Sequence, residues 1–235
     1  MSKAAPHPVA NRLLARLPGV ERRRILQQAD RVELRFGTIL CEPDEPLPNV
    51  YFPLTASISL MMPVSGRHPL EIGLIGNEGM LGTTLALGMN AMPLRAFVQG
   101  SGTALRIATA RFRRDLARSP ALLRRLNRYA YVLMAQLSQT AACTRFHGVE
   151  ARLARWLLLS HDRAHADQFR LTHKFLAGML GVRRSGVTIA AGDLQRRELI
   201  SYTRGEITVL DRKGLEAASC ECYGAAVADY AQVFG

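Results

Sequence analysis

The spacing of apolar positions divides the chain into a strand-rich first half and a helical second half. Between residues 8 and 24 apolar side chains recur at helical spacing, interrupted by Pro18-Gly19, which predicts a short helical lead-in. From residue 32 to residue 110, short β-type runs alternate with Gly, Pro, Asn and Asp. The clearest runs are 50–52, 57–61, 71–75 and 104–107. This pattern predicts a small antiparallel barrel or roll.

A long helix is predicted to begin at Ser119-Pro120, because proline is tolerated in a first helical turn and no proline follows downstream. Residues three or four apart form an apolar stripe along this helix of about 25 residues. The stripe is too long for one small domain to cover, which favours a coiled-coil-like dimer contact. The alternative is a helix packed against its own sheet. The side chains expected to form the dimer contact are Leu126, Leu133, Leu137 and Thr140.

Residues 171–185 have the pattern of a helix, a tight turn and a second helix. Thr172 is the expected N-cap of the first helix, and Gly181 can adopt the positive φ that a sharp turn needs. The second helix, predicted over 183–198, keeps apolar residues at three-to-four spacing for a core. The residues left on its outward face near its start are Arg183, Arg184, Ser185 and Thr188.

These outward residues suit the reading of DNA bases. In a helix-turn-helix the first residues of the second helix reach base edges in the major groove. An arginine fork matches O6 and N7 of guanine, while Ser and Thr can contact several bases. Residues 199–210 follow with the pattern of a hairpin, or wing, and Asp211 is expected to cap one more helical turn. Thr172, Lys174 and Arg204 are predicted to contact phosphates.

In its order of parts the chain resembles the Crp/Fnr family of bacterial transcription regulators over nearly its whole length. The residues that carry the resemblance are Leu171-Thr172, 180–184, Leu194, Leu199-Ile200, Tyr202 and 204–207. It implies an α+β fold with a cyclic-nucleotide-binding-type β-roll in a sensor domain over 1–118, a dimerisation helix over 119–147 and a winged helix-turn-helix over 148–235. It also implies a homodimer that binds palindromic double-stranded DNA and recruits or blocks RNA polymerase.

The chain departs from the catabolite activator type of this family at its reading helix and in its sensor half. That type opens the helix with an Arg-Glu pair and has a second Arg one turn on, where this chain has Arg184, Ser185 and Ile189. Only the Arg184 role is carried over, and the preferred DNA sequence should differ.

In the sensor half, the resemblance implies a Gly-Glu for the ribose of a cyclic nucleotide and an Arg for its phosphate. Thr83, after Gly82, stands where the Glu is expected, whereas Arg95-Ala96 stands at the phosphate position. Glu78 can replace the missing Glu only if the register slips. These five residues are the candidate effector pocket for a cyclic nucleotide, and a roll with another ligand or none is the alternative.

The cysteines and histidines predict no metal site. The family's iron–sulfur type needs four thiolates, most of them near the N-terminus, and Cys41 is the only cysteine in the first 140 residues. Cys220 and Cys222 form a bare Cys-x-Cys without a second pair at zinc-finger distance, so a structural or redox role stays open. The clustered histidines are expected to be solvated or capping, namely His147, His161, His165 and His173.

Composition adds a preference for a polyanionic partner. Lys and Arg number 31 against 19 Asp and Glu, a formal charge of +12. Charge of this kind also fits a non-specific basic nucleic-acid-binding protein, which is the main alternative. No apolar run has the length of a signal peptide or a membrane span, so we expect a cytoplasmic protein with no membrane partner.

Catalysis is not expected. The acid or base candidates Asp44, His68 and Glu78 are far apart in sequence, and the fingerprints of hydrolases, zinc proteases and nucleotide-binding enzymes are missing.

Overall fold

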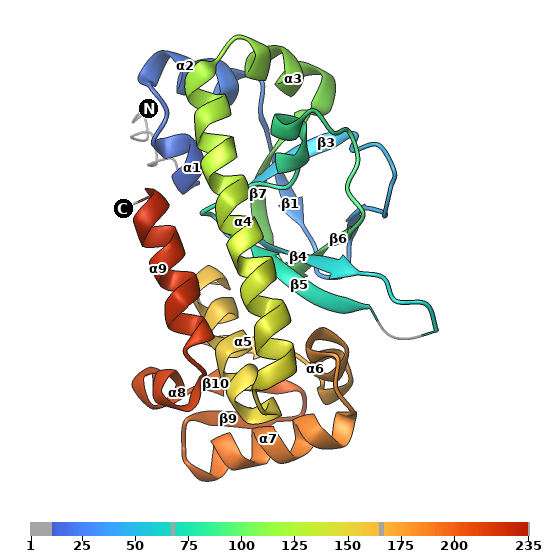
Figure 1. Cartoon of the computed structure of the whole chain (residues 1–235), viewed down its shortest axis with the longest axis vertical. Helices are drawn as coiled ribbons and strands as arrows, with labels where there is room; N and C mark the ends of the chain where they lie inside the picture. The colour runs from blue at the N-terminus through green and yellow to red at the C-terminus, as the bar shows by residue number, and fades with distance from the viewer. Residues whose placement is uncertain (1–10, 67–68, 165–166, 235) are drawn as a thin grey trace, which may run out of the picture.

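The computed structural model describes residues 11–66, 69–164 and 167–234 (Figure 1). His68 and His165, and the first residues of the predicted helical lead-in, lie outside these ranges. Two antiparallel sheets form a roll in the N-terminal half, with strand orders β1-β7-β3 and β2-β6-β4-β5. The strands are β1 (Asp30–Leu34), β2 (Ile39–Cys41), β3 (Asn49–Pro53), β4 (Ser57–Met62), β5 (Leu70–Ile75), β6 (Arg95–Gly100) and β7 (Gly102–Ala108). The predicted roll is confirmed.

Short helices close the ends of the roll. They are α1 (Arg12–Ala15), α2 (Gly19–Gln27), the 3-10 helix η1 (Thr83–Leu87) and α3 (Thr109–Ala117). The break between α1 and α2 falls at Pro18, as predicted. Asn11 caps α1 by accepting a hydrogen bond from the Leu14 backbone N–H, and its amide donates to the Pro53 and Gly79 carbonyls. One buried asparagine therefore fastens the first helix to the roll.

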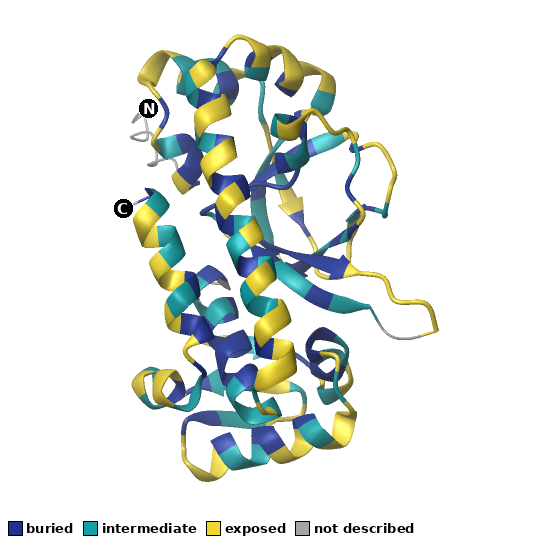
Figure 2. Cartoon of the chain, in the orientation of Figure 1, coloured by how far each residue is buried: buried dark blue, intermediate teal, exposed yellow. Residues whose placement is uncertain are grey.

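The long helix α4 (Pro120–Phe146) begins where proline at a first turn predicted it. The Ser119 hydroxyl accepts a hydrogen bond from the Leu122 N–H and caps the helix. Its buried face packs into the core of the roll through Leu122, Leu126, Tyr129 and Val132. Buried and exposed residues alternate down its length (Figure 2), so the opposite face is open.

The C-terminal domain has its own core and a small antiparallel sheet of order β8-β10-β9. Its elements are α5 (Val149–Ala164), β8 (Gln168–Arg170), α6 (His173–Leu180), α7 (Arg184–Arg196), β9 (Ile200–Thr203), β10 (Glu206–Val209) and α8 (Arg212–Ala218). The apolar spacing that predicted the second helix is explained by burial, since Val187, Ala190, Ala191 and Leu194 all lie in this core. The predicted hairpin and the Asp211 cap are also present.

The last helix, α9 (Cys222–Phe234), runs back along α4 (Figure 1). Phe234 joins the core of the roll, with its ring centroid 6.4 Å from that of Tyr129. The segment 148–235 therefore does not pack as one unit, because its final helix covers α4 and the roll.

Buried polar contacts join the two halves. Arg163 of α5 donates to Glu78 at 2.8 Å, and both side chains are less than a tenth exposed. The Trp156 indole N–H donates to Glu71 at 2.7 Å, and Ser59 donates to the other oxygen of that carboxylate. Burial raises the pKa of Glu71 to about 7, against the lowering effect of these hydrogen bonds. Among the helices of the described residues, none is long and apolar enough to span a bilayer.

Candidate nucleic-acid interface

The turn between α6 and α7 places the start of α7 at the surface. Gly181 has φ of 63°, in the left-handed region, and its N–H donates to carbonyls of the last turn of α6. The Thr172 hydroxyl accepts from the Phe175 N–H at 3.2 Å, so the predicted N-cap is confirmed. The residues predicted to read bases, Arg183, Arg184, Ser185 and Thr188, are all exposed, on the face opposite the buried stripe of α7.

A stack of side chains holds α6, α7 and the wing together. His173 stacks on Tyr202 with ring centroids 4.5 Å apart, and the Tyr202 hydroxyl donates to the Leu171 carbonyl. Thr188 Oγ1 lies 2.9 Å from His173 Nδ1 and 3.1 Å from the Arg184 carbonyl oxygen. The Thr188 hydroxyl therefore has hydrogen-bonding partners within the protein, although the side chain is exposed. The sequence does not predict this stack; it predicts only that His173 is solvated or capping.

The wing is a tight hairpin whose tip lies beside the start of α6. Arg204 and Gly205 join β9 to β10 with φ of 53° and 83°, the pair of positive values typical of a type I′ turn. The Leu171 N–H donates to the Gly205 carbonyl at 2.7 Å. Arg204, Thr172 and Lys174, predicted to contact phosphates, are therefore neighbours and all exposed.

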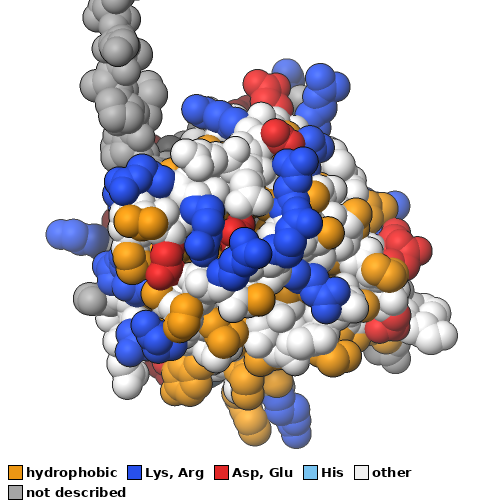
Figure 3. Space-filling view, turned by 90° about the horizontal axis from the view of Figure 1, so that it is seen from above, with side chains coloured by type: hydrophobic (Ala, Val, Ile, Leu, Met, Phe, Trp, Pro, Cys, Tyr) orange, Lys and Arg blue, Asp and Glu red, His pale blue; other side chains and the backbone are white. Residues whose placement is uncertain are grey.

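Positive charge also gathers at the opposite end of the molecule. Figure 3 shows Lys and Arg side chains over the end formed by α2, α3 and the start of α4. Exposed arginines there are Arg16, Arg23, Arg111, Arg113, Arg114, Arg118, Arg124 and Arg128. The net charge of +12 thus does not by itself mark the DNA-binding end. The candidate interface comprises the exposed first turn of α7 and the wing.

The five residues predicted to form an effector pocket have separate partners. Glu78 is buried and pairs with Arg163 at the contact between the halves, so its carboxylate is not available to an effector in the roll. Arg95 pairs with Glu42 at 2.7 Å and is about two-fifths exposed. The Thr83 hydroxyl donates to the Met80 carbonyl, and Ala96 is fully buried. Gly82 has φ of 106°, and a Cβ there would come within 2.7 Å of a Val50 methyl, so this loop is closely packed.

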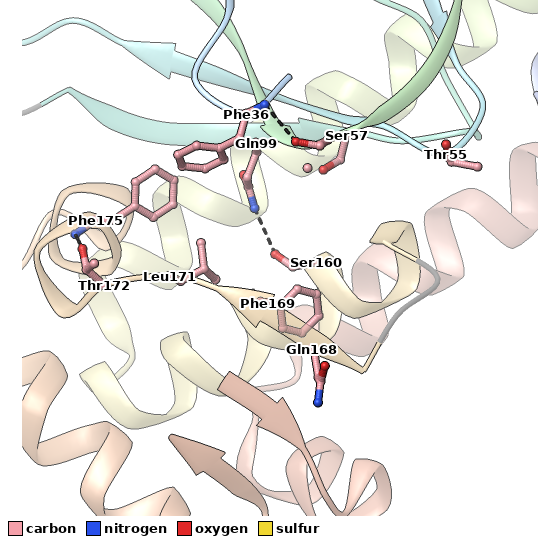
Figure 4. Close-up of a pocket in the computed structure, with 12 residues that line it drawn as sticks. Phe36, Thr55, Ser57, Gln99, Ser160, Gln168, Phe169, Leu171, Thr172 and Phe175 are labelled. Atoms are coloured by element: carbon pink, nitrogen blue, oxygen red, sulfur yellow. Dashed lines mark hydrogen bonds between the residues drawn. The ribbon is translucent and has the colours of Figure 1, made fainter. Parts of the chain in front are cut away.

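A cavity of about 720 Å³, the interdomain cavity, lies between the roll and the C-terminal domain (Figure 4). Its apolar wall includes Phe36 and Phe175, whose ring centroids are 5.6 Å apart. Gln99 of the roll donates to Ser160 of α5 at 3.2 Å across its floor. None of the described residues that line it carries a formal charge. Its lining comes from segments far apart in sequence, so no local pattern could have indicated it.

The predicted dimer stripe is partly occupied within one protomer. Leu126 is fully buried in the core of the roll and cannot reach a second copy, which corrects that prediction. Leu133, Leu137 and Thr140 are half-buried, and Thr140 accepts a hydrogen bond from Arg155 of α5. The large apolar residues that α4 exposes near its middle are Tyr131 and Met134.

Comparisons with known proteins agree with this geometry. Residues 151–218 match the Crp-like helix-turn-helix domain, which comprises α5 to α8. No curated protein matches the chain. The chain is similar to FixK2 from Bradyrhizobium japonicum, at 15% identity and a TM-score of 0.68, covering 82% of this chain and 98% of that one.

Two further solved structures are similar over the same extent. A Crp/Fnr transcriptional regulator from Thermus thermophilus is 22% identical with a TM-score of 0.67, covering 81% of this chain and 98% of that one. The c-di-GMP responsive global regulator CLP from Xanthomonas campestris is 17% identical with a TM-score of 0.66, covering 82% and 99%. At these identities the likeness shows a shared fold.

The chain thus combines a β-roll, a long connecting helix and a winged helix-turn-helix, and its residues 151–218 form a Crp-like helix-turn-helix domain. The solved structures that share its fold include a transcriptional regulator of the Crp/Fnr family.

Proposed function

We propose that this chain is a transcription regulator of the Crp/Fnr type, which binds one palindromic DNA sequence as a homodimer, reads it with the first turn of α7 and acts on RNA polymerase in the cytoplasm. The observation that carries the proposal is the joint exposure of Arg183, Arg184 and Ser185 at the start of α7, beside the exposed wing residue Arg204. A guanidinium can bind O6 and N7 of guanine together, whereas backbone contacts from the wing and Lys174 would fix the register.

The dimer contact we propose uses the open face of α4. Residues Asn127, Tyr131, Met134, Ser138 and Ala141 are all exposed. Their spacing alternates between four and three, the heptad spacing of two helices that pack along a shared seam. Met134, Ser138 and Ala141 each follow directly after one of the half-buried residues predicted from sequence, which are Leu133, Leu137 and Thr140. A dimer on this seam would place two α7 helices about a two-fold axis, which a palindrome matches.

Selection from randomised duplex DNA, followed by sequencing, tests the reading role. We expect one enriched palindrome for the wild-type chain. Arg184→Ala should lose about 1–3 kcal/mol of discrimination at one base pair of each half-site. The control is Arg113→Ala, which removes an exposed arginine of α3 at the opposite end and should leave the palindrome unchanged. If the wild-type chain enriches no sequence, the non-specific basic binder replaces this proposal.

Effector control is proposed at the interdomain cavity rather than within the roll. Its volume falls in the range of about 300–1,000 Å³ common for small-molecule sites. Its uncharged, aromatic lining suits a neutral compound with an aromatic ring, whereas the phosphate of a cyclic nucleotide needs a cation. A ligand there would contact the roll and α6 together, and so change how the reading helix sits.

A thermal-shift screen compares neutral aromatic compounds with cyclic AMP and cyclic di-GMP. We expect stabilisation by a neutral compound, lost in Gln99→Leu and kept in Arg95→Ala. Stabilisation by a cyclic nucleotide that depends on Arg95 would return the effector site to the roll.

A further inference from the structure

Four side chains with metal-binding atoms converge where the end of α4 meets the start of α9. They are Cys143, His147, Cys220 and Cys222, here called the Cys3His cluster, and their three Sγ atoms and one ring nitrogen all lie within 4.8 Å of one another. Cys143 Sγ and Cys220 Sγ are 3.5 Å apart, as are Cys222 Sγ and His147 Nδ1. The three cysteines are buried, and the His147 side chain is 23% exposed.

We propose that the Cys3His cluster binds one Zn²⁺ ion and fastens α9 to α4. Three thiolates and one imidazole are a ligand set of structural zinc sites. With Zn–S about 2.3 Å and Zn–N about 2.0 Å, the ligand atoms of a tetrahedral site lie roughly 3.4–3.8 Å apart. The two 3.5 Å separations fall within that range. A single ion therefore needs little movement of these side chains.

The spacing of the ligand atoms favours one ion over an iron–sulfur cluster. A [2Fe–2S] or [4Fe–4S] cluster places several iron and sulfide atoms between its protein ligands. Four ligand atoms that lie within 4.8 Å of one another enclose space for a single ion. Zinc also needs no redox partner, and none of the three cysteines of the cluster is in a disulfide, so all three thiols can ligate it.

Groups around the cluster are placed as outer partners of a zinc site. The Glu221 carboxylate lies 3.1 Å from His147 Nε2, so it can accept a hydrogen bond from the Nε2–H and favour the tautomer whose unprotonated Nδ1 faces the cysteines as a ligand. The Gln139 amide donates to Cys222 Sγ at 2.9 Å. Three thiolates and a zinc ion leave one negative charge, and Arg152 and Arg155 of α5 lie close enough to act on Cys143 and offset it.

The sequence does not indicate this site, because its two pairs of ligand residues are far apart along the chain. Cys143 and His147 are one helical turn apart on α4, so they share a face. Cys220 and Cys222 follow some 75 residues later in sequence. The sequence predicts no metal site because Cys220 and Cys222 lack a second pair at zinc-finger distance. His147, expected to be solvated or capping, is the C-cap residue of α4.

The experiment uses the full chain, purified without a histidine tag, freed of metal under reducing conditions and titrated with Zn²⁺ or Co²⁺. We expect one ion per chain by elemental analysis, and with Co²⁺ the visible absorption of a tetrahedral thiolate site. Cys222→Ser should lose the ion, whereas Cys41→Ser should keep it, because Cys41 is a buried cysteine of the roll. Circular dichroism checks that each variant is folded.

A milder variant separates metal binding from folding. Glu221→Gln changes an exposed side chain that touches the cluster only through His147, and it should weaken Zn²⁺ binding about 10- to 100-fold in a chelator competition. Unchanged affinity in Glu221→Gln and Cys222→Ser together would overturn the site. So would binding of less than half an equivalent by the reduced wild-type chain, or isolation with iron and acid-labile sulfide in place of zinc.

Discussion

Replacing Glu78 by glutamine should sharply weaken the contact between the two halves. Its carboxylate accepts from Arg163 at 2.8 Å and from the Gly76 N–H at 3.0 Å, while the Tyr230 hydroxyl donates at 3.3 Å. Glutamine keeps the size and one acceptor oxygen, so packing changes little and the lost charge dominates. The Arg163 guanidinium then stays buried without a counter-charge.

The magnitude follows from burial. Removing one partner of a buried pair costs about 3–5 kcal/mol, and the isosteric change argues for the lower end, about 3 kcal/mol. Arg163→Met removes the other partner and leaves the Glu78 carboxylate buried without its paired cation, so it should cost a similar amount. The double variant should cost less than the sum of the single variants.

Urea unfolding followed by fluorescence measures these costs. Trp156 is the only tryptophan of the chain and hydrogen-bonds Glu71 across the same contact, so its emission reports the separation of the halves. The control pair is Arg106 and Asp30, 3.2 Å apart but 41% and 72% exposed, where Arg106→Met should cost about 1 kcal/mol or less. A cost below 1 kcal/mol for Glu78→Gln, or strict additivity in the double variant, would refute the reasoning.

Three further outcomes test other parts of the structure. If the proposed dimer forms on the open face of α4, Met134→Asp should place charges in that contact and give a folded monomer by light scattering. An unchanged mass would contradict the proposed contact. Because burial raises the pKa of Glu71 from 4.5 to about 7, the folded chain holds that proton more tightly than the unfolded chain. The resulting stabilisation is at most about 3 kcal/mol; it is full below pH 4.5 and is lost as pH rises through 7. Glu71→Gln should remove this part of the pH dependence, which is measured by comparing urea midpoints at pH 5 and pH 8. Gly79→Ala should lower the melting temperature, because its Cβ would lie 1.9 Å from the hydroxyl of the buried Tyr129, and an unchanged melting temperature would contradict that packing.

Local signals were sufficient for much of the fold. The N-cap at Thr172, the positive φ at Gly181 and the wing turn each depend on residues close in sequence, and all were predicted. Strands β1, β2 and β6 were not among the predicted runs. Strand β1 is largely exposed and alternates charged with apolar residues, which blurs the strand pattern. Strand β8 lies in a polar stretch and exists through its pairing with β10.

The functional residues were harder to predict where the same type of residue can serve either the core of the protein or a contact with another molecule. Helix α4 carries one apolar stripe buried by its own roll and another that is open, and their members differ by a single position, as Leu133 and Met134 show. Periodicity alone cannot say which stripe faces a second copy. Glu78 resembles a ligand-binding carboxylate in its Gly-rich loop, yet its partner Arg163 comes from another domain. Tertiary pairing of this kind leaves no trace in local sequence.

The position of Phe234 sets an order for folding during synthesis. The core of the roll contains side chains from α1 onward, but Phe234 enters it roughly 100 residues after Val132, on the order of 10 s later at ordinary rates of translation. Until α9 emerges, the side of α4 that it covers is open to water or to chaperones. A ribosome that stalls within the C-terminal domain would therefore present a nearly finished roll with one apolar side uncovered, which makes such fragments ready substrates for proteolysis.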